Sequence, residues 1–594
     1  MKKAFLAAVL SMCVFGSSVM GADCTYSSTQ SASLYLYDAN MCGTDVNEKS
    51  QESWRGDCHT CDSSVPLDTS HTDLSQSFID SNRAVLDPDG NGLIDLSGGY
   101  HDAGDHVKFG LPQMYTAVTL QWALYEFKDS FEHNGDMAHF RTVLDRFTSY
   151  IKKCTFLNTD GEVVAFCHMV GEGNSDHSYW GAPESQTTAR PAYFATAQTP
   201  ATDITSLAAA ALAADYANTG DSESLKYAKA LYSFTYNSPN KAVGDDRGTF
   251  YDSQNYNDDL AYAAAWLYTT TNDSTYLSQA EGLMGNAVYD VPYWVYCWDN
   301  TWSGSVMLLG EKTGNNAYLS SIEQMLNNWQ NNYNTPQGYA CINEWGSARY
   351  NANAQFIALI YAKHTGKTAY AEWAKKQIDY LLGDNNANTC YVTGLCSNSV
   401  KYPHHRAASG LSDANDSSPH KYTLRGALVG GPDKNDYHID STGNYQYSEV
   451  AIDYNAGFVG ACAGLYALYE DKGDTSSTTT TETTTETTTV TVTETSTETT
   501  TVTENTTETT TENTDTVLMG DVNLSGTVTA EDAAYLLQKT LQSAFTMGCE
   551  SKYPDNYIPL IADVTGDGIL SSGDSAAIIQ KSLDNSFVFE ALIK

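Results

Sequence analysis

Positively charged residues are scarce in this sequence. Its 594 residues include 32 Lys and Arg against 72 Asp and Glu, which gives a formal net charge of -40 at pH 7. Binding to nucleic acid requires a basic surface that neutralises phosphates, so this balance argues against a nucleic-acid partner. It suits a neutral substrate, bound calcium, or both.

Long apolar runs are also missing, apart from one at the N-terminus. No later stretch reaches the roughly 18 apolar residues that a membrane-spanning helix needs, so we expect no membrane insertion. The N-terminal run follows Lys2 and Lys3, is too short to span a membrane, and ends at the small residues Gly21 and Ala22. This pattern is typical of a cleaved export signal. Residues 1–22 are therefore predicted to be a signal peptide, and the mature protein to be secreted.

Cysteines remain in an even number once the signal is removed. The sequence has 13 Cys, of which Cys13 lies in the signal. An even number permits disulfides in an oxidising exterior. The thiols can equally stay reduced or bind metal.

Aromatic residues, Lys and Arg are absent from residues 473–516, which consist almost wholly of Thr and Glu. Such a segment cannot bury enough apolar area to offset the entropy of ordering it, and its like charges keep it extended. We therefore predict a disordered linker whose Thr hydroxyls suit O-glycosylation. It separates a large unit, residues 23–472, from a small unit, residues 517–594.

The large unit has few alternating strand patterns and many helical ones. Segments such as "SLAAAALAADYANTG" and "AGFVGACAGLYALYE" repeat Ala, Leu and aromatic positions every three or four residues. Several of these segments end at Gly, Asn or Asp, as helices do. Repeated helix pairs joined by long polar loops predict an all-α toroid with a site on its loop face. Most of the Ala and aromatic positions are expected in the core.

The small unit contains two copies of one pattern, "GDVNLSGTVTAEDAAYLLQKTL" and "ADVTGDGILSSGDSAAIIQKSL". Each copy is half of a calcium hand, a ligand loop followed by one helix. The expected ligands are Asp521, Asn523, Ser525, the Thr527 carbonyl and Asp532 in the first loop, and Asp563, Thr565, Asp567, the Ile569 carbonyl and Asp574 in the second. Thr565 offers a neutral hydroxyl where the first loop has an amide, so the second loop should bind calcium more weakly.

Three segments of the large unit contain the residues that suggest a reaction. They are "GGYHDAGDHVKFGLP" at 98–112, "YPHHR" at 402–406 and "YSEVAIDYNAGF" at 447–458. Together they resemble the glycoside hydrolases of family 9, most of whose members are inverting β-1,4-glucanases. The resemblance covers nearly all of the large unit and implies an (α/α)6 barrel.

The resemblance implies roles for three carboxyl groups. Inverting hydrolysis needs one protonated carboxyl for the leaving oxygen and one carboxylate that deprotonates a water on the opposite face, about 6.5 to 9.5 Å away. Asp105 resembles the family's general base, Asp102 the partner that helps to hold the attacking water, and Glu449 the general acid. Apolar neighbours should help to raise the pKa of Glu449 by desolvation, as a proton donor at neutral pH requires.

Further side chains match active-site positions of the family. They are His404, Arg406 and Asp440, together with His177 and Trp180 in the segment "DHSYWGAPE" at 176–184. The resemblance implies that His and Arg donate to sugar hydroxyls, and that Asp accepts from them or orients the acid. The indole face of Trp180 is expected to stack on a glucosyl ring.

The terminal repeat resembles a type I dockerin, the module that attaches cellulosomal enzymes to cohesins. Family 9 catalytic units joined to dockerins through Thr-rich linkers are a known combination, so each resemblance supports the other. A cohesin of a scaffoldin is therefore an expected partner, and calcium an expected ligand of residues 517–594.

Metal sites inside the large unit are also expected. Asp258, Asp259 and Asp299 match positions that bind a structural calcium in some relatives; the alternative is an acidic helix start. Cys154, Cys167 and His168 match a structural zinc cluster of some relatives, but a fourth ligand is not identifiable and a Cys154 to Cys167 disulfide is an equal alternative. The pair of cysteines in "CHTC" at 58–61 is expected to be structural.

The sequence thus predicts a secreted, cellulosomal endo-β-1,4-glucanase that binds cellulose or another β-glucan. One alternative is a family member that prefers xyloglucan, mixed-linkage glucan or mannan, or that releases cellobiose from chain ends. Another is a glycan-binding or scaffold protein without activity. The intact carboxyl groups at 102, 105 and 449 argue against the second alternative, because binding alone does not need an acid and a base.

Overall fold

The computed structural model describes residues 24–237, 239, 250–253, 255–286 and 291–470. These residues belong to the first of the two units into which the chain divides, Met1–Thr478. The predicted signal peptide, linker and dockerin-like unit lie outside them. Among the described helices, none is long and apolar enough to cross a membrane.

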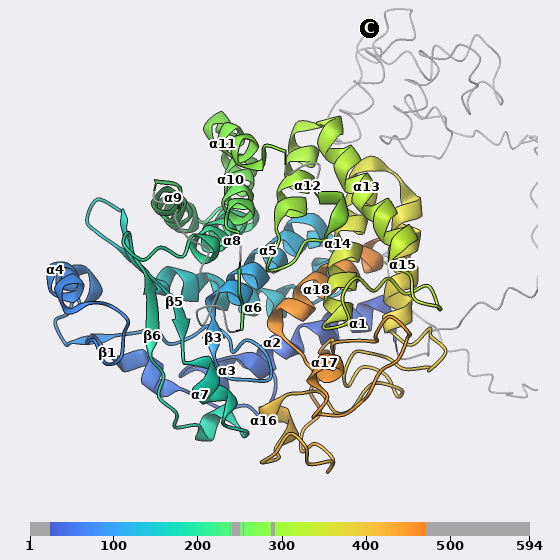
Figure 1. Cartoon of the computed structure of the whole chain (residues 1–594), viewed down its shortest axis with the longest axis horizontal. Helices are drawn as coiled ribbons and strands as arrows, with labels where there is room; N and C mark the ends of the chain where they lie inside the picture. The colour runs from blue at the N-terminus through green and yellow to red at the C-terminus, as the bar shows by residue number, and fades with distance from the viewer. Residues whose placement is uncertain (1–23, 238, 240–249, 254, 287–290, 471–594) are drawn as a thin grey trace, which may run out of the picture. The chain divides into compact units, whose positions relative to one another are not determined.

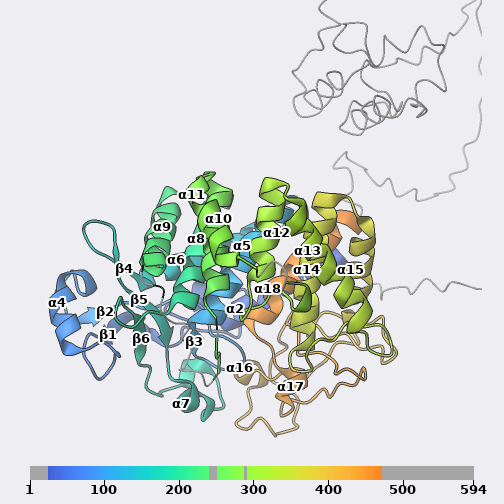
Figure 2. The same ribbon diagram turned by 45° about the horizontal axis from the view of Figure 1, so that its top comes forward.

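Six helices form a closed inner ring (Figures 1 and 2). They are α5 (Gly110–His133), α8 (Thr202–Thr219), α10 (Asn257–Thr271), α12 (Trp302–Thr313), α14 (Ser347–Thr365) and α18 (Ile452–Tyr469). Each helix contacts the next in this order, and α18 returns to α5. They are buried over most of their length, which is why their Ala- and Leu-rich sequences are apolar on every side.

A second set of helices covers the ring from outside. It consists of α6 (Met137–Cys154), α9 (Ser222–Asn237), α11 (Ser274–Met284), α13 (Asn316–Asn332), α15 (Thr368–Leu381) and α1 (Tyr26–Ser33). These helices bury one face each, as α6 does through Phe140, Val143, Leu144 and Phe147. Six inner helices paired with six outer ones confirm the expected helical architecture and are consistent with an (α/α)6 barrel.

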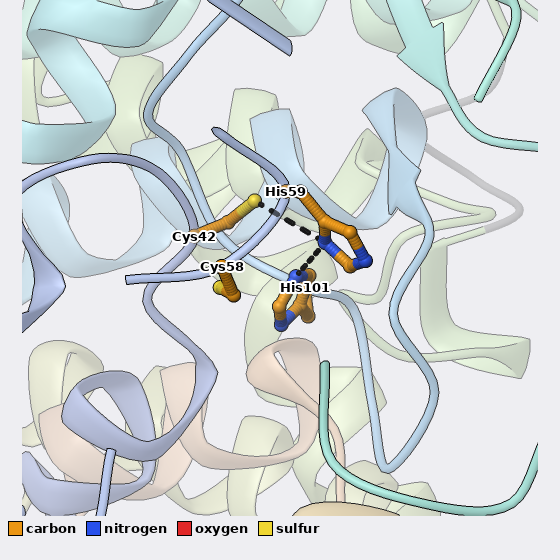
Figure 3. Close-up of side chains that lie close together, drawn as sticks. All are labelled: Cys42, Cys58, His59 and His101. Carbon is orange, nitrogen blue, oxygen red and sulfur yellow. Dashed lines mark hydrogen bonds between the residues drawn. The ribbon is translucent and has the colours of Figure 1, made fainter. Parts of the chain in front are cut away.

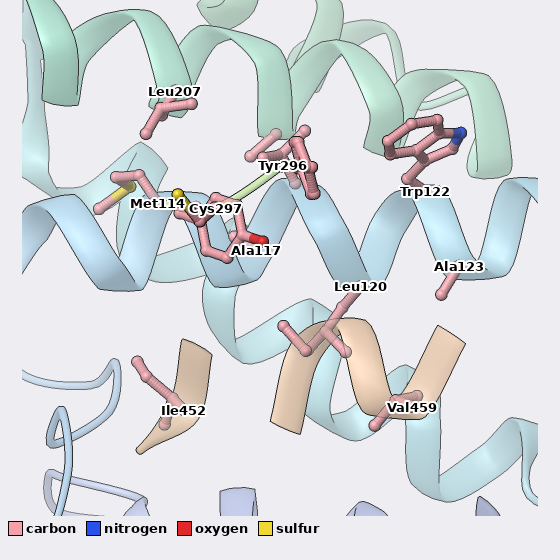
Figure 4. Packing of buried hydrophobic residues seen from close by; sticks show 14 of the residues in the cluster. Met114, Ala117, Leu120, Trp122, Ala123, Leu207, Tyr296, Cys297, Ile452 and Val459 are labelled. Carbon is pink, nitrogen blue, oxygen red and sulfur yellow. The ribbon is translucent and has the colours of Figure 1, made fainter. Parts of the chain in front are cut away.

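The core of the ring is visible where α5 runs between α18 and α8 (Figure 4). Leu120 of α5 points toward α18, which contributes Ile452 and Val459, and Trp122 points toward α8 on the other side. The side chains are completely or almost completely buried. Burying side chains of this size stabilises the fold by about 1.5–3 kcal/mol each.

Inner helices end where the sequence analysis placed stop signals. Gly220, Gly314 and Gly366 follow α8, α12 and α14 in the left-handed conformation, and Asn272 follows α10 in the same way. Each donates its N–H to a carbonyl of the last turn, so that this carbonyl group has a hydrogen-bond partner at the helix end.

The structure adds a small antiparallel sheet that the sequence analysis did not expect. Its strands are β3 (Lys108–Phe109), β4 (Thr155–Leu157), β5 (Val163–Val170) and β6 (Ala192–Ala195), in the order β3-β5-β4 with β6 also paired to β5. Strand β3 leads from the segment with Asp102 and Asp105 into α5. Strand β5 precedes α7 (Gly173–His177). The sheet therefore sets the positions of two site segments relative to each other.

The remaining elements are short or peripheral. They are α2 (Tyr35–Asn40), α3 (Val46–Lys49), α4 (Gln76–Leu86), α16 (Arg406–Ser409), α17 (Tyr445–Ser448), the pair β1 (Val65–Pro66) and β2 (Leu93–Ile94), and the 3-10 turns η1 (Thr60–Ser64), η2 (Pro183–Ser185) and η5 (Val291–Tyr293). A disulfide joins Cys24 to Cys396, with their Cα atoms 5.9 Å apart.

Candidate active site

The three motif segments are joined by backbone hydrogen bonds at the N-terminal ends of α5 and α18. The Arg406 N–H donates to the Gly104 carbonyl at 3.1 Å, and the Ile452 N–H donates to the Asp102 carbonyl at 2.8 Å. Gly104 permits this approach, because a Cβ there would lie 2.0 Å from the His404 carbonyl oxygen. Segments about 300 residues apart in the sequence therefore form one rigid unit.

Two of these segments, 98–112 and 447–458, line a cavity of about 490 Å³, whereas His404 and Arg406 of the third segment are not among its lining residues. The side chains of Asp102, Asp105 and Glu449 all line it. Its other lining residues are mostly aromatic or polar: Phe109, His177, Phe250, Tyr251, Trp298, Asn343, Trp345, Arg349, Tyr350 and Tyr454. Aromatic faces mixed with a few carboxylates suit a neutral, hydroxylated ligand such as a sugar ring.

Asp105 is held by its own loop. Its Oδ1 accepts the Ala103 N–H and its Oδ2 accepts the Val107 N–H, both at 3.1 Å. These two backbone donors fix the orientation of the Asp105 carboxyl group, as a positioned general base requires. Each oxygen keeps a second lone pair, so Asp105 can still accept a proton from a water in the cavity.

Asp102 lines the same cavity and has one side-chain oxygen without a hydrogen-bond partner among the described residues. Its Oδ2 accepts the Tyr251 hydroxyl at 2.5 Å, whereas Oδ1 is buried and has no hydrogen-bond partner among the residues that the structure describes. Burial and the nearby Asp105 carboxylate raise the pKa of Asp102 well above its ordinary range. A buried oxygen without a partner costs free energy unless something fills its place, so a water between the two aspartates is expected.

Glu449 receives two hydrogen bonds on one oxygen. Its Oε2 accepts the Trp345 indole N–H at 2.8 Å and the Tyr454 hydroxyl at 3.0 Å. Burial raises the pKa of Glu449, so the protonated form persists to higher pH than for an exposed glutamate. Since Oε2 faces two donors, the proton belongs on Oε1, where it is available for transfer.

His404 and Arg406 lie beside Trp180. The His404 ring lies 4.9 Å from the Trp180 ring, and the Arg406 guanidinium lies 5.3 Å from the same ring. Burial lowers the pKa of His404 to about 4, so the ring is neutral at pH 7. Its Nδ1 donates to the Thr442 carbonyl at 2.7 Å. His404 Nε2 therefore carries no proton and can accept a hydrogen bond, whereas the sequence predicts a donor at this position.

Asp440 is placed outside the cavity. Its exposed carboxylate accepts the N–H groups of Lys401 (2.9 and 3.1 Å) and Tyr402 (2.9 Å). These bonds hold the segment that carries His404 and Arg406. Asp440 therefore positions other residues, and its carboxylate contacts neither Glu449 nor the cavity lining.

His177 and Trp180 follow β5 on either side of a short turn. Helix α7 begins at a Glu172 side chain that accepts two N–H groups of its first turn. His177 lines the cavity, with its ring 4.5 Å from that of Phe250. Trp180 lies with Arg406 at the edge of the site, and its indole N–H donates to the Ser409 hydroxyl at 3.2 Å.

Several residues of the cavity are not predicted by the sequence. Tyr251, Trp345 and Arg349 lie in no segment that it singled out, while Tyr454 lies unremarked in the same motif as Glu449. The only sequence signal for Trp345 and Arg349 is their place around the start of a predicted helix, in "EWGSARY". Such a signal is too weak to have found them.

Four buried side chains form a compact group next to the active-site loop (Figure 3). They are Cys42, Cys58, His59 and His101, whose ligand atoms all lie within 4.8 Å of one another. His59 Nδ1 is 3.0 Å from His101 Nε2 and 3.8 Å from Cys42 Sγ. A hydrogen bond from Cys42 and the positive charge of Arg55 lower the pKa of Cys58 to about 7, which favours a thiolate. Two thiols and two imidazoles are a donor set that suits tetrahedral zinc.

The zinc ligands expected from the sequence are arranged differently. Cys154 and Cys167 are buried as free thiols in contact with each other, so the structure does not contain the alternative disulfide between them. His168 follows Cys167 on β5, and the three do not form a group with all ligand atoms within 4.8 Å. The sequence predicts a structural role for Cys58 but does not reveal the group that it shares with Cys42, His59 and His101.

The acidic residues at the start of α10 are buried. Thr301 donates its N–H to Asp258 Oδ2 at 2.9 Å and its hydroxyl to Asp259 Oδ1 at 3.0 Å. Asp258 Oδ1 is buried, and none of the described residues donates a hydrogen bond to it. Burial raises the pKa of Asp258 to about 6, and burial together with Asp258 raises that of the more exposed Asp299 to about 6. In the described part of the chain, Asp258, Asp259 and Asp299 do not form a group with all ligand atoms within 4.8 Å. A buried, unsatisfied carboxylate oxygen with further carboxyl groups nearby still fits a bound cation that takes oxygen ligands.

The expected ligands of the terminal calcium loops lie outside the described residues. They are Asp521, Asn523, Ser525, Thr527 and Asp532, and Asp563, Thr565, Asp567, Ile569 and Asp574.

Residues 26–462 match the family model described as Glycosyl hydrolase family 9. Among curated proteins, Endoglucanase A of Bacillus pumilus is 36% identical over 465 residues, which cover 74% of this chain and 65% of that protein. The Endoglucanase of Dictyostelium discoideum is 38% identical over 403 residues, which cover 64% of this chain and 55% of that protein. The chain therefore spans less than two thirds of the length of these relatives.

Solved structures are similar over the same region. The catalytic domain of Clostridium thermocellum CelT is 49% identical and superposes with a TM-score of 0.73, covering 75% of this chain and 98% of that one. The cellulase Cel9M of C. cellulolyticum is 41% identical with a TM-score of 0.66, covering 76% and 100%.

Proposed function

Because this chain belongs to glycosyl hydrolase family 9, we propose that it is an endo-β-1,4-glucanase that hydrolyses cellulose and related β-glucans with inversion. The observation that carries the proposal is the meeting of Asp102, Asp105 and Glu449 in one aromatic-lined cavity. Similar proteins bear the name endoglucanase, and one solved relative is a cellulase in complex with cellobiose.

Glu449 is the general acid of this proposal. Its protonated Oε1 donates to the glycosidic oxygen as the bond between that oxygen and the anomeric carbon breaks. Trp345 and Tyr454 bind the other oxygen, and so stabilise the carboxylate that is left behind.

Asp105 is the general base. It removes a proton from a water held against the free Oδ1 of Asp102, and the water oxygen attacks the anomeric carbon on the face opposite the leaving group. The Tyr251 hydroxyl fixes the orientation of Asp102. The product therefore has the α configuration at its new reducing end.

Side chains around the acid and base bind the sugar. His404 accepts from a hydroxyl through Nε2, and the buried Arg406 Nε, which lacks a hydrogen-bond partner in the described part of the chain, is available as a donor. Trp180 and Trp345 offer ring faces for stacking on glucosyl units.

The proposal is tested by Asp105→Asn and Glu449→Gln. Each variant should lose about 10²- to 10⁴-fold in turnover on an unsubstituted β-glucan and keep its melting temperature within a few degrees. Glu126→Gln, which neutralises a buried carboxyl far along α5 from the site, is the matched control and should retain turnover. Near-normal activity of either site variant would refute the assignment, and proton NMR that shows β-anomer as the first product would refute inversion.

Substrate preference follows from the shape of the cleft and needs its own measurement. Initial rates and products on cellulose derivatives, xyloglucan, mixed-linkage glucan, mannan and cello-oligosaccharides distinguish an endoglucanase from the other family activities. Random shortening of long chains supports the endo mode, whereas cellobiose as the sole early product supports release from chain ends. No reducing sugar from any of them supports a binding protein.

We also propose that the protein is secreted and attached to a scaffoldin cohesin through residues 517–594. The support is the N-terminal sequence, the Thr-rich linker and the paired calcium loops. Calorimetric titration of the whole chain with cohesins should show tight binding in calcium. Asp521→Ala with Asp563→Ala should abolish that binding without loss of glucanase activity.

Two metals complete the proposal. Zinc held by Cys42, Cys58, His59 and His101 would act as a structural cross-link beside Asp102, and calcium near Asp258, Asp259 and Asp299 would neutralise buried carboxylates. Metal analysis of the purified protein should find zinc that is lost in Cys58→Ser and kept in Cys154→Ser. The opposite result would favour the set Cys154, Cys167 and His168.

A further inference from the structure

A buried ion pair lies beside the general acid and is not explained by the proposed reaction. Asp453, in the first turn of α18, accepts a hydrogen bond from Arg349, in the first turn of α14, with 2.9 Å between Oδ2 and the guanidinium nitrogen. Asp453 is fully buried, and only 9% of the Arg349 side chain is exposed. Buried pairs of this kind are costly to desolvate, so a role other than stability has to be considered.

Arg349 connects this pair to the acid. Its guanidinium carbon lies 4.6 Å from the ring centroid of Tyr350 and 4.6 Å from that of Tyr454, so that the group is in contact with both rings. It also donates to the Tyr350 hydroxyl at 3.0 Å. Tyr454 in turn donates to Glu449 Oε2. A chain of contacts therefore runs from Asp453 through Arg349 and Tyr454 to Glu449.

Charge is balanced along the same chain. Two of the charged groups that act on Glu449 are Arg349 from α14, which favours its ionised form, and Asp453 from α18, which opposes ionisation. Glu449 and the Asp102 carboxyl before α5 also disfavour each other's ionisation. The other groups that touch Glu449, Trp345 and Tyr454, are neutral donors. Without Asp453, the unopposed guanidinium would draw the acid toward its carboxylate form.

We propose that Asp453 is a positioning residue for the general acid, because its carboxylate fixes Arg349 against Tyr454 and cancels the guanidinium charge close to Glu449. The inference rests on the proposed function, in which Glu449 donates a proton. Asp453 itself has no contact with substrate: it acts on Glu449 through Arg349 and Tyr454 and through its own negative charge.

The sign of the expected effect follows from these charges. Removing the negative charge of Asp453 lowers the pKa of Glu449, both because a negative neighbour is lost and because Arg349 becomes unopposed. A general acid is active only while protonated, so the alkaline limb of the rate profile should move to lower pH. Removing the positive charge of Arg349 should move the same limb to higher pH.

The experiment compares pH profiles of kcat/KM for hydrolysis of a neutral β-glucan by the whole chain. Asp453→Asn should shift the alkaline limb down by about half a pH unit or more, while kcat on the acidic side stays within a few fold of wild type. Arg349→Met should shift the limb up, at a lower overall rate because Arg349 lines the cavity. In the double variant Arg349→Met with Asp453→Asn, the limb should return toward that of wild type.

A matched control separates this effect from loss of stability. Glu126 is also buried and paired, to Lys363 at 2.9 Å, near the C-terminal end of α5. Glu126→Gln should lower the melting temperature, as Asp453→Asn should, and leave the alkaline limb in place.

The outcomes distinguish the inference from the function on which it rests. If wild type hydrolyses β-glucan but the limb does not move in Asp453→Asn, or moves in the same direction in both single variants, the inference is wrong. Should Asp453→Asn fail to fold, the Arg349→Met variant tests the inference instead. A shift of its alkaline limb to higher pH supports the inference, and a shift to lower pH contradicts it. If Glu449→Gln keeps full activity, the proposed function itself is wrong.

Discussion

Both hydrogen bonds that Glu449 receives end on the same oxygen, and this asymmetry decides which atom carries the proton. Tyr454 can reach that oxygen because residue 346 is glycine. A Cβ at Gly346 would lie 2.7 Å from the Tyr454 hydroxyl oxygen, and the residue has a φ of +68°, which favours glycine. A residue that does not line the cavity thus controls the geometry of the acid.

Gly346→Ala should therefore reduce catalysis more than stability explains. The added methyl group displaces the Tyr454 hydroxyl from Glu449, and misplacement of a catalytic group on this scale costs roughly tenfold to a hundredfold in kcat. Steady-state kinetics with melting temperatures measure both effects. Gly366→Ala is the matched control: it follows the other end of α14 with a φ of +70°, and a methyl group there meets none of the described atoms within 4 Å. Equal loss of kcat in the two variants would contradict the explanation.

Single residues of the site differ in how far the sequence predicts them. Asp102, Asp105 and Glu449 stand in motifs whose chemistry is readable, because acid and base catalysis needs carboxyl groups of contrasting environment. Trp345 is one of ten Trp and Tyr251 one of 40 Tyr, and many such rings are buried in the core. Only the folded chain shows which rings direct a polar atom at a carboxylate.

Elements of secondary structure were predictable where they are long and periodic. The inner helices have continuous Ala- and Leu-rich runs, and the outer ones have one-sided stripes, so both could be recognised. The small sheet could not be recognised from the sequence. Strands β3 and β6 have two and four residues, too few for an alternating pattern, and "VVAFCHMV" of β5 is a continuous apolar run that fits a buried helix equally well.

The start of α10 makes stability depend on pH and calcium together. The pKa of Asp258 in the folded chain, about 6, exceeds the ordinary value, so the protonated form is the one that the fold favours. Without calcium, the contribution of protonated Asp258 to the free energy of unfolding is fully present below the ordinary pKa near 4. It is lost as pH rises through 6. The loss amounts to roughly 3 kcal/mol of unfolding free energy for Asp258 alone.

Melting of the whole chain should therefore respond to chelator at pH 7.5 and hardly at all at pH 4. Calcium should raise the melting temperature at pH 7.5 by neutralising the carboxylates, and Asp258→Asn should remove that response in the transition of the helical ring. The variant keeps any calcium bound by residues 517–594, so it separates the two proposed sites. A calcium response of this transition that is unchanged in Asp258→Asn would place the metal elsewhere.

The molecule as a whole is held together by contacts between segments that are remote in sequence. The ring closes only when α18 packs on α5, and the group around Cys58 takes ligands from positions 42, 58, 59 and 101. An even number of cysteines permits many pairings, and the sequence does not choose among them. In the structure a disulfide joins Cys24 to Cys396, which are 372 residues apart in the sequence. This disulfide fixes the N-terminal segment before α1 to the loops that follow α15.

Removal of this disulfide should destabilise the helical ring and leave its activity intact. A cross-link over so long a loop restricts the unfolded chain strongly, and the loss of such a bond typically costs about 2–5 kcal/mol. Neither cysteine lines the cavity, so Cys24→Ser with Cys396→Ser should keep kcat at 25 °C while guanidinium unfolds the ring at a lower midpoint. Reducing agent should lower the midpoint of wild type to that of the variant. Cys61→Ser, which removes an exposed free thiol, is the control and should change neither quantity. An unchanged midpoint in the double variant under oxidising conditions would show that the bond does not stabilise the fold.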